Sequence, residues 1–485
     1  MKIKRIIALL LCIFMVFAAT SVCADSGIGV TAIKLIDTKD GKTVAAHFDD
    51  ILDKIIEEYK YDITKEELLA STVKEFLTAH PEYLAEFGKG AFEALDENSN
   101  FYTRQEYTAV NEDVSGNYVG IGIYVSQEGT QIVLGEPIEG SPAENSGLRV
   151  GDVIKAVDGV DVTDFALDKV TSLIKGKAGS TVNITVLRNG IEYTYTLTRA
   201  EISINPITYS VIDGTDAGYV KISSFNANTA QEFAKAAAEF HEKGITKIVL
   251  DVRNNRGGYL AHALVVASFF IPDNKVIVTK EHKNPLYNEE YTSIETPYKF
   301  KAVVLINQHS ASASELVASA IRDYDAGVLV GKRSYGKGSV QEVVPLGSFN
   351  YLWMTTAEYF TPSHTPIHKV GLEPDYIVAN TTKKFDMSTL EKYDSSRVYK
   401  IGDKGEDVRK LKDRFRLLGY TLPQDDVYDT NMANAVTQFQ KATELFPYGV
   451  ADITTQMKLN DVFVDMDVEV DKQYELAVEL VKKLK

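Results

Sequence analysis

The pattern of hydrophobic positions divides the chain into stretches typical of strands and stretches typical of helices. Compact apolar runs at 247–251, 301–306 and 328–331 are bounded by polar residues and are typical of buried strands. Apolar or small-residue stretches of helical length follow the first two of these runs. Strand and helix patterns therefore alternate through the middle of the chain.

Outside this middle region the spacing of apolar residues favours helices. Residues 43–111 are rich in helix formers, with apolar side chains at helical spacing. Within 399–460, one helical face collects apolar residues before Gly419, which is suited to ending a helix. An apolar stripe in 471–485 ends in lysines that suit the helix dipole, and it predicts a helix docked on the protein's own core or on a partner subunit.

Length and charge limit what the chain can be. Its 485 residues suffice for three or four domains, and 45% hydrophobic residues allow each domain a core. The net charge of −16 argues against nucleic acid as a partner, because phosphate backbones are bound by clustered Lys and Arg.

Residues 1–24 have the pattern of a secretory signal peptide. Three basic residues precede an apolar run over 6–19, and small residues lead to an expected cleavage after Ala24. The run is borderline in length for a membrane anchor if it stays uncleaved. Both cysteines lie in this segment, so a mature chain has no thiol and cannot be a cysteine protease. We expect a secreted or envelope-associated protein.

Two polar segments in the middle region carry the candidate chemistry. Ser312 lies in S-A-S-A-S-E between a strand and a helix pattern, and Lys337 lies between glycines in Y-G-K-G-S-V-Q. A serine hydroxyl becomes a useful nucleophile when a neutral amine beside it takes its proton. Burial would have to lower the lysine pKa by about 3, at a cost of about 4 kcal/mol. Gln341 would share a face with Lys337 in an extended segment.

Simpler interpretations of these two segments compete with the catalytic one. Ser312 and Glu315 also form the S-x-x-E pattern of a helix capping box. Residues 331–337 read G-x-x-x-x-G-K as in a P-loop, but Gly338 occupies the position of the magnesium-binding Ser or Thr. The lysine segment favours the catalytic interpretation over the capping box.

The histidines offer weaker candidates. His309 lies three residues before Ser312, but nothing in the sequence brings its ring to the hydroxyl, and a turn residue is the simpler interpretation. His364 and His368 have H-x-x-x-H spacing, but the neighbouring prolines disfavour a shared helical face and no third ligand is evident. No metal site is predicted.

Taken together, the two polar segments resemble those of the carboxyl-terminal processing proteases, and the resemblance covers nearly the whole chain. That family carries S-A-S-A-S-E with the middle serine as nucleophile, and F-G-K-G-T-V-Q with the lysine as base and the glutamine orienting it. The resemblance implies these roles for Ser312, Lys337 and Gln341. It also implies a crotonase/ClpP-like α/β catalytic core over 201–385 that needs no cofactor.

A second loop of the middle region is a candidate for binding an oxyanion. It follows the strand pattern at 247–251 and ends in Gly257 and Gly258, which let backbone N–H groups approach a substrate carbonyl. In the resembled family this loop donates one N–H and the residue after the nucleophile donates the other. The resemblance thus implies Gly257 or Gly258 together with Ala313, and an ordinary glycine turn is the alternative.

Residues 113–200 resemble a bacterial PDZ domain. An Asp-Gly turn at 158–159 between apolar strands predicts a hairpin, and 166–174 is the expected helix beside the peptide groove. Such domains hold a terminal carboxylate with backbone N–H groups, here expected from Gly120, Ile121, Gly122 and Ile123. Arg188 is a candidate to couple peptide occupancy to the catalytic lobe, and a solvated strand-end arginine is the alternative.

The two ends of the chain also carry resemblances. Residues 398–462 resemble the peptidoglycan-binding domain of cell-wall proteins through G-D-x-G-x-D-V and A-V-x-x-F-Q, and a small helical docking module is the alternative. A helical tail is expected over 463–485. Within the helical region 25–112, residues 92–102 resemble the family's L-D-P-x-S-x-Y segment. Because this region often mediates dimerisation in relatives, a homodimer is expected.

The combined interpretation is a multidomain α/β serine endopeptidase that cleaves polypeptides near their free C-termini. Peptidoglycan is a second candidate partner, and neither a cofactor nor a nucleic acid is expected. The main alternative is a non-catalytic adaptor whose PDZ and wall-binding modules scaffold a partner protease. A carrier of hydrophobic ligands built on the same core is a further alternative.

Overall fold

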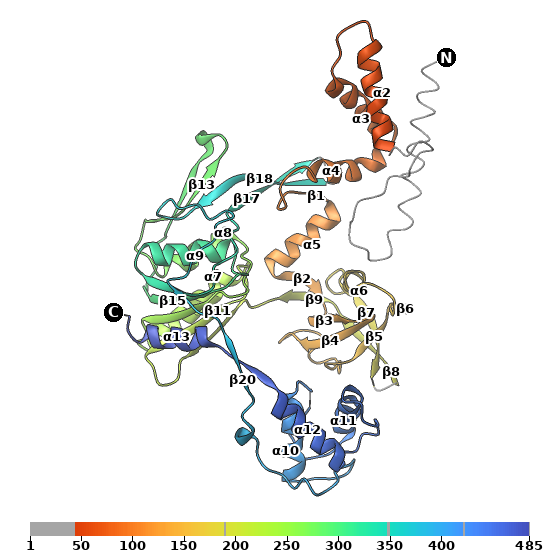
Figure 1. Ribbon diagram of the computed structural model, residues 1–485, viewed down its shortest axis with the longest axis vertical. Helices are drawn as coiled ribbons and strands as arrows, with labels where there is room; N and C mark the ends of the chain where they lie inside the picture. The colour runs from red at the N-terminus through yellow and green to blue at the C-terminus, as the bar shows by residue number, and fades with distance from the viewer. Residues whose placement is uncertain (1–43, 189–190, 347–349, 421, 485) are drawn as a thin grey trace. The chain divides into compact units, whose positions relative to one another are not determined.

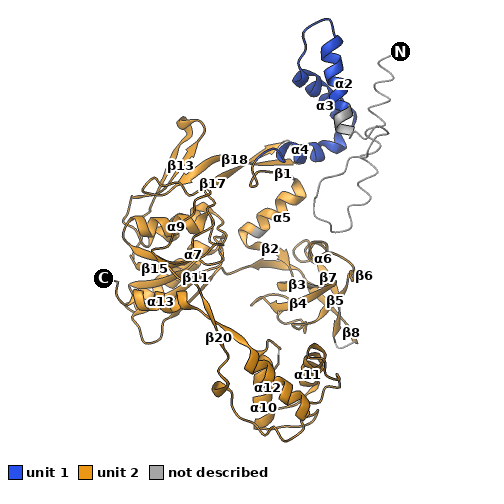
Figure 2. Cartoon of the chain, viewed as in Figure 1, with its two compact units in different colours: residues 1–95 blue, residues 96–485 orange. Residues whose placement is uncertain are grey.

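The computed structural model describes residues 44–484 apart from 189–190, 347–349 and 421. The expected signal peptide at 1–24 lies outside the described residues. The chain separates into two compact units, 1–95 and 96–485, which Figure 2 colours differently. In the part that is described, no helix combines the length and apolar character needed to cross a membrane.

The described part of the first unit is helical. Thr64 and Glu67 form a capping box at the start of one helix, with the Glu67 carboxylate 2.9 Å from the Thr64 nitrogen. Apolar side chains such as Tyr61, 65% exposed, remain on its surface. Its elements are α2 Val44–Glu58, α3 Lys65–Ala79, the 3-10 turn η1 Pro81–Tyr83 and α4 Leu84–Phe92.

A six-stranded sheet of the second unit, here called the central sheet, has the order β10-β11-β12-β15-β16-β19. Figure 1 labels its strands β11 and β15. The first pair is antiparallel and all other neighbours are parallel. The predicted buried runs are confirmed as β12, β15 and part of β16. The strands are β10 Ile207–Val211, β11 Ala217–Ile222, β12 Lys247–Asp251, β15 Lys301–Ile306, β16 Gly327–Gly331 and β19 Tyr376–Ile377.

Helices cover both faces of this sheet. Since successive side chains of a strand point to opposite sides, neighbouring residues of one strand pack against different helices. Ile248 and Leu250 pack among three helices on one face, whereas Val249 packs with Ala477 and Val481 of the last helix on the other. The C-terminal helix therefore docks on the protein's own core. The helices are α7 Thr229–Glu242, α8 Leu260–Ser268, α9 Ala313–Asp323 and α13 Lys472–Val481.

A second, antiparallel sheet has the order β1-β18-β13-β14, with β17 also paired to β18. Strand β1 lies in the region that the sequence predicts to be helical, so that prediction is wrong for these four residues. Its partner β18 lies about 250 residues further along the chain, so no local sequence signal indicates the strand. The elements are β1 Asn100–Thr103, β13 Val276–His282, η2 Pro285–Tyr287, β14 Glu289–Thr292, β17 Ser339–Leu346 and β18 Asn350–Phe360.

The PDZ region forms a sheet of order β3-β4-β5-β7-β8, with β6 paired to β5. Asp158 and Gly159 both have positive φ, 48° and 79°, and close the predicted hairpin between β5 and β6. The elements are α5 Arg104–Ser115, β2 Asn117–Gly120, β3 Ile123–Glu128, β4 Gln131–Pro137, β5 Val153–Val157, β6 Val160–Asp161, α6 Leu167–Ile174, β7 Thr181–Arg188, β8 Ile191–Thr198 and β9 Ala200–Ser203.

The wall-binding-like region is a small helical module with its own apolar core. It is inserted between two strands that pair with each other, β20 and β21, before the chain returns to the central sheet. Its last helix continues past the expected boundary at 462. The elements are β20 Thr381–Lys384, η3 Met387–Thr389, α10 Glu406–Leu417, α11 Thr430–Ala442, α12 Ile453–Asp465 and β21 Asp467–Val470.

Candidate active site

Ser312 lies at the turn between β15 and α9 in a strained conformation, with φ 56° and ψ −120°. A non-glycine residue adopts such angles only where its surroundings hold it there. The two flanking serines provide part of that hold: Ser310 donates its hydroxyl to the Val252 carbonyl at 2.8 Å, and Ser314 donates to the Asn255 carbonyl at 2.9 Å. These two hydroxyls are thus committed to backbone carbonyls on either side of Ser312.

Glu315 connects the serine turn to the lysine loop. Its Oε2 accepts the backbone N–H of Ser312 at 2.7 Å and that of Lys337 at 2.9 Å. Its Oε1 accepts the Ser334 hydroxyl at 2.5 Å and the Gly336 N–H at 2.7 Å. Burial raises the pKa of Glu315, while these four hydrogen bonds oppose the shift. The carboxylate considered as a helix cap thus also aligns the two candidate catalytic residues.

Lys337 lies just before β17, in a loop whose two flanking glycines pass close to neighbouring backbone. A Cβ at Gly338 would lie 2.4 Å from the backbone nitrogen of His368, and one at Gly336 would lie 2.9 Å from the nitrogen of Gly371. Burial lowers the pKa of Lys337, and the charge of Asp96 opposes that shift. A lowered pKa is what a lysine base requires.

The hydroxyl of Ser312 and the amine of Lys337 are not hydrogen-bonded to each other within the described residues. A direct proton transfer between these two groups would need a side-chain movement that brings them within hydrogen-bonding reach. Catalytic hydrogen bonds often tighten only when substrate is bound.

Gln341 occupies a bulge in β17, where the pairing register with β18 shifts between Val340 and Gln341. Its relation to Lys337 therefore does not follow from simple strand alternation, as the sequence had suggested. Its Nε2 donates to the hydroxyls of Ser339 and Thr355, both at 3.0 Å. The amide is held by both of its donors, which leaves its carbonyl oxygen as the remaining acceptor.

The competing interpretations of this region fare differently. Residues 331–338 connect strand β16 to strand β17, whereas a P-loop leads into a helix, so the P-loop interpretation is wrong. His309 is exposed, as expected of a turn residue. No cluster of three or more metal-ligating side chains exists among the described residues.

The diglycine loop lies directly against the serine turn. A Cβ at Gly257 would lie 2.9 Å from the Cβ of Ser312 and 3.0 Å from the nitrogen of Ala313. The Gly257 N–H is already donated to the buried side chain of Asn255 at 2.8 Å. The N–H groups of Gly258 and Ala313 make no hydrogen bond in the described part of the chain. These two N–H groups are therefore the available donors beside Ser312.

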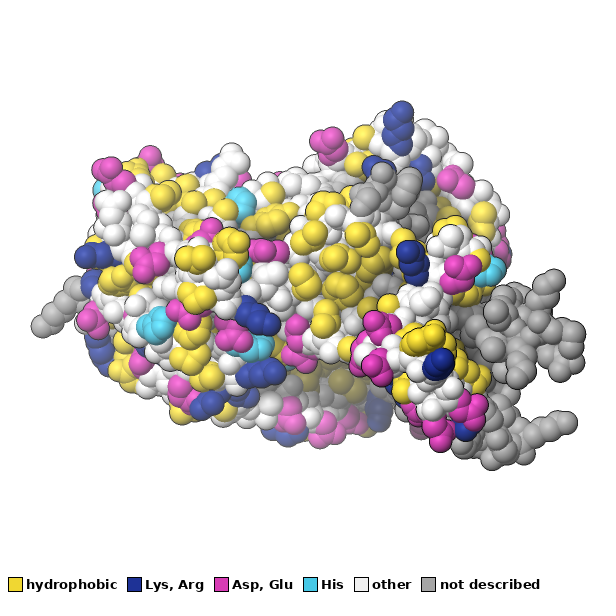
Figure 3. All heavy atoms as spheres, turned by 90° about the horizontal axis from the view of Figure 1, so that it is seen from above, with side chains coloured by type: hydrophobic (Ala, Val, Ile, Leu, Met, Phe, Trp, Pro, Cys, Tyr) yellow, Lys and Arg dark blue, Asp and Glu magenta, His cyan; other side chains and the backbone are white. Residues whose placement is uncertain are grey.

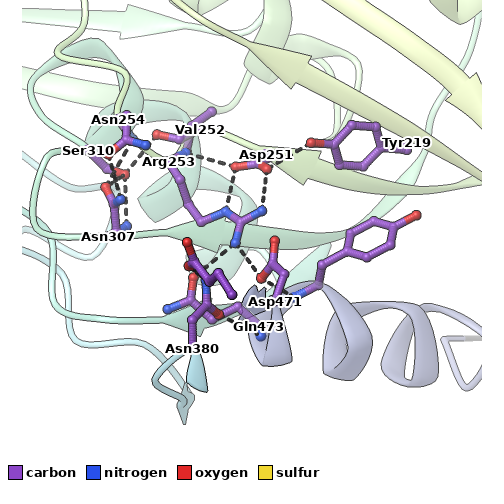
Figure 4. A network of polar contacts seen from close by, with 12 residues as sticks. Tyr219, Asp251, Val252, Arg253, Asn254, Asn307, Ser310, Asn380, Asp471 and Gln473 are labelled. Carbon is purple, nitrogen blue, oxygen red and sulfur yellow. Dashed lines mark hydrogen bonds and ion pairs between the residues drawn. The ribbon is translucent and has the colours of Figure 1, made fainter. Parts of the chain in front are cut away.

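A polar network that sequence reasoning missed supports the start of this loop (Figure 4). Arg253 donates to both carboxylate oxygens of Asp251, at 3.0 and 2.7 Å, and also to Asp471 at 2.7 Å. Although burial opposes it, these ion pairs raise the pKa of Arg253. The network thereby ties the segment before α13 to the loop that leads to the diglycine. The contact spans 218 residues, so no local signal could have indicated it.

The PDZ domain presents an edge strand and a loop of unused donors. Strand β3 is a terminal strand of its sheet, and α6 contacts it. The carbonyl of Ile121 accepts from Ala143, and that of Gly122 accepts from Ile138 and Ser141. The N–H groups of Ile121 and Gly122 donate to no group in the described residues. An edge strand beside such a loop suits the addition of a peptide strand.

Arg188 contacts residues of its own domain. Its guanidinium donates to both oxygens of the buried Asp152 carboxylate, each at 2.6 Å, and to the Gly147 carbonyl at 2.9 Å. Its side chain is only 14% exposed, so a solvated strand-end arginine is excluded. These contacts brace the turn before β5 and do not involve β3 or α6.

In the helical C-terminal module, Lys412 is fully buried and donates to Asp425 at 2.5 Å, which ties α10 to the loop before α11.

On the face shown in Figure 3, acidic and basic side chains are interspersed over the surface.

Comparisons with known proteins agree with this architecture. Residues 216–378 match Peptidase family S41, residues 119–198 match the PDZ domain, and residues 404–459 match a peptidoglycan binding domain. The site and these matches define a serine peptidase with a PDZ domain, which acts on polypeptides.

Individual relatives give the family. The CtpA-like serine protease of Staphylococcus haemolyticus is 32% identical over 401 residues, which cover 81% of this chain and 78% of the relative. That of Staphylococcus saprophyticus is 31% identical over 408 residues, 82% and 81% of the two chains. The solved photosystem II D1 C-terminal processing protease is 28% identical over 68% of this chain and 92% of its own, with a TM-score of 0.42. The chain belongs to the CtpA-like serine proteases.

Proposed function

We propose that this protein is an exported endopeptidase that cleaves polypeptides near their C-termini, with Ser312 as nucleophile and Lys337 as general base. The observation that carries the proposal is the Glu315 carboxylate, one oxygen of which holds the backbone N–H groups of both residues. A shared acceptor keeps the serine turn and the lysine loop in register.

In this mechanism the neutral amine of Lys337 takes the hydroxyl proton as the Ser312 oxygen attacks the scissile carbonyl. The N–H groups of Gly258 and Ala313 bind the oxyanion of the tetrahedral intermediate. Lys337 then returns the proton to the leaving amine, and an acyl-enzyme remains on Ser312. The same amine then takes a proton from water, whose oxygen attacks the acyl-enzyme. Lys337 returns this proton to the Ser312 oxygen as the ester bond breaks and the new C-terminus leaves.

Recognition of C-termini is assigned to the PDZ domain. A peptide would add to the free edge of β3 and place its carboxylate at the unused N–H groups of Ile121 and Gly122. The buried side chain of Ile121 and the hydrogen bonds accepted by the Ile121 and Gly122 carbonyls hold the loop in this conformation without a bound peptide. Amidation of a substrate's C-terminus removes the negative charge and should therefore raise KM.

Location and assembly follow from the other regions. The export signal expected at 1–24 and the match to a peptidoglycan binding domain support a site of action in the cell envelope, with glycan as a second ligand. The exposed apolar side chains of the first unit support a homodimer formed through its helices. Analytical ultracentrifugation of the full chain, with and without residues 44–95, tests the homodimer.

The test of the activity is cleavage of an unstructured polypeptide by the wild type and by Ser312→Ala, Lys337→Ala and Lys332→Ala variants. Lys332 is an exposed lysine of the same connection, so it controls for the loss of a positive charge. We expect the first two variants to lose at least about 1,000-fold in kcat/KM and the control to match the wild type. If the wild type cleaves the polypeptide no better than the Ser312→Ala and Lys337→Ala variants at any pH, with or without a PDZ-binding peptide, the non-catalytic adaptor is favoured over the protease.

A further inference from the structure

A chain of hydrogen bonds runs from Gln341 to a carboxylate in the turn before β1. The Thr355 hydroxyl, opposite Gln341 on β18, donates to Asp96 Oδ1 at 3.0 Å and accepts from Gln341 Nε2 at 3.0 Å. The other Asp96 oxygen accepts the Ser99 hydroxyl at 2.8 Å. The Ser99 oxygen in turn accepts the Thr355 N–H at 3.0 Å. Four residues from three segments thus form one network.

The carboxylate sets the direction of every bond in this network. An ionised carboxylate can only accept, so the single hydroxyl proton of Thr355 is committed to Asp96. The Thr355 oxygen then offers Gln341 only lone pairs, and it must receive the amide N–H. The Gln341 carbonyl oxygen is left pointing elsewhere, as the acceptor that the amide can present to the Lys337 amine. Without Asp96, a rotated Thr355 hydroxyl could bond the amide oxygen and the amide could flip.

We propose that Asp96 and Thr355 are positioning residues of the base side, which fix the orientation of the Gln341 amide and place a negative charge near Lys337. The roles proposed above for Ser312 and Lys337 are a premise of this assignment. Hydrogen bonds from Ser99, Asn98 and Thr355 outweigh the effect of burial and lower the pKa of Asp96, which keeps it ionised at neutral pH.

Among the described residues, Asp96, Glu315 and His368 are titratable residues that lie against the Lys337 segment. Asp96 acts on the lysine through its charge, and Glu315 on α9 binds the backbone N–H of Lys337. His368 lies beside Gly338 from the loop that follows β18. Only the first changes in an Asp96 variant, so a shift seen in that variant is assigned to the lost carboxylate.

The experiment measures kcat and kcat/KM against pH for wild type, Asp96→Asn, Thr355→Val and Thr355→Ser. Glu97→Gln is the matched control, because Glu97 is an exposed neighbour with no hydrogen bond or ion pair of its side chain in the described structure. Circular dichroism and thermal unfolding check that each variant is folded. Lys337→Ala, included in parallel, tests the premise.

Loss of the carboxylate in Asp96→Asn should lower kcat about tenfold and move the acid limb of kcat/KM to lower pH, because a lysine without a nearby negative charge loses its proton more easily. Thr355→Val should lower kcat about tenfold without moving the limb, since the Asp96 charge remains. Thr355→Ser should recover most of that loss, and KM should change little in all three.

Asp96→Asn and Glu97→Gln profiles that coincide would overturn the role of Asp96, and equal activities of Thr355→Val and Thr355→Ser would overturn that of Thr355. If Asp96→Asn does not fold, the comparison of Thr355→Val with Thr355→Ser still decides whether the hydrogen-bond network affects kcat. A Lys337→Ala variant as active as the wild type would instead refute the premise and the proposed function with it.

Discussion

The turn that carries Ser312 and the loop that carries Lys337 both bind Glu315, but the rest of their support differs. Behind the serine lie buried contacts with backbone carbonyls, such as those of Ser310 and Ser314, and a glycine loop in direct contact. Beside the lysine lie a strand bulge and a polar chain that ends at Asp96, which is exposed. The serine side has little room to relax, whereas the lysine side can be adjusted by movements of side chains.

A methyl group at Gly258 should produce the largest effect of this comparison. Its Cβ would lie 2.3 Å from the Phe225 carbonyl oxygen, and its φ of 141° is unfavourable for alanine. We expect Gly258→Ala to lower kcat about 100- to 1,000-fold, the loss seen when an oxyanion donor is removed. Gly214→Ala, which also has positive φ but open space around it, should leave kcat unchanged. A Gly258→Ala enzyme with near-normal kcat would contradict the tight fit of this side.

Glu315→Gln removes the acceptor that the two sides share. In the wild type a carboxylate oxygen of Glu315 accepts the backbone N–H groups of Ser312 and Lys337, and in the variant the amide NH₂ could face these donors instead. Each N–H left without an acceptor would cost about 1–3 kcal/mol of stability. We expect kcat/KM to fall about 30- to 100-fold and the melting temperature to fall as well. The exposed Glu373, paired with Arg333, provides the control variant Glu373→Gln, which should change either quantity little. Similar kinetics for the two variants would show that Glu315 does not align the site.

Gly338→Ala probes the lysine side by the same kind of change. Its Cβ would lie 2.4 Å from the His368 nitrogen, but the loop that carries His368 is partly exposed and can shift. We expect a loss of about tenfold in kcat, smaller than for Gly258→Ala. Steady-state assays of the two variants side by side measure the contrast, and a larger loss at Gly338 would reverse it.

Asp471→Asn should have the smallest effect, because it acts on the diglycine loop only through Arg253. Burial opposes the shift, but the bond from Arg253 contributes to lowering the pKa of Asp471, so its ionised form stabilises the fold above the unfolded pKa of about 3.9. We expect a loss of about 0.5–1 kcal/mol in stability at pH 7 and two- to fivefold in kcat. The stability difference should shrink as pH falls from 5 to 3, measured by thermal unfolding. A difference that grows on acidification would contradict the ion pair.

The part of the site that was predictable is the part built from neighbouring residues. The runs that became β12 and β15 are apolar throughout, and the motifs around Ser312 and Lys337 are contiguous. The involvement of Asp96, Thr355 and Asp471 was not predictable, because each meets its partner across a sheet or from a distant helix. The donation of the Gly257 N–H to Asn255 likewise depends on a side-chain orientation that spacing does not reveal.

The fold shows the same division. The hairpin at Asp158-Gly159 and the helices of the C-terminal module follow from local turn and periodicity signals. The residues of strand β1 were expected to be helical. That prediction failed because the strand is stabilised by pairing with β18 and not by its own four residues alone. The insertion of the helical module between β20 and β21 also depends on a long-range pair.

The most direct test of the central claim is a titration of the Lys337 amine itself. Reductive methylation with ¹³C-formaldehyde labels the lysines of the full chain, and the NMR signal absent from Lys337→Ala assigns the residue. Burial should keep its pKa well below about 10.4, the ordinary value of a lysine side chain. A Lys337 signal that titrates together with the exposed lysines would contradict its role as the base.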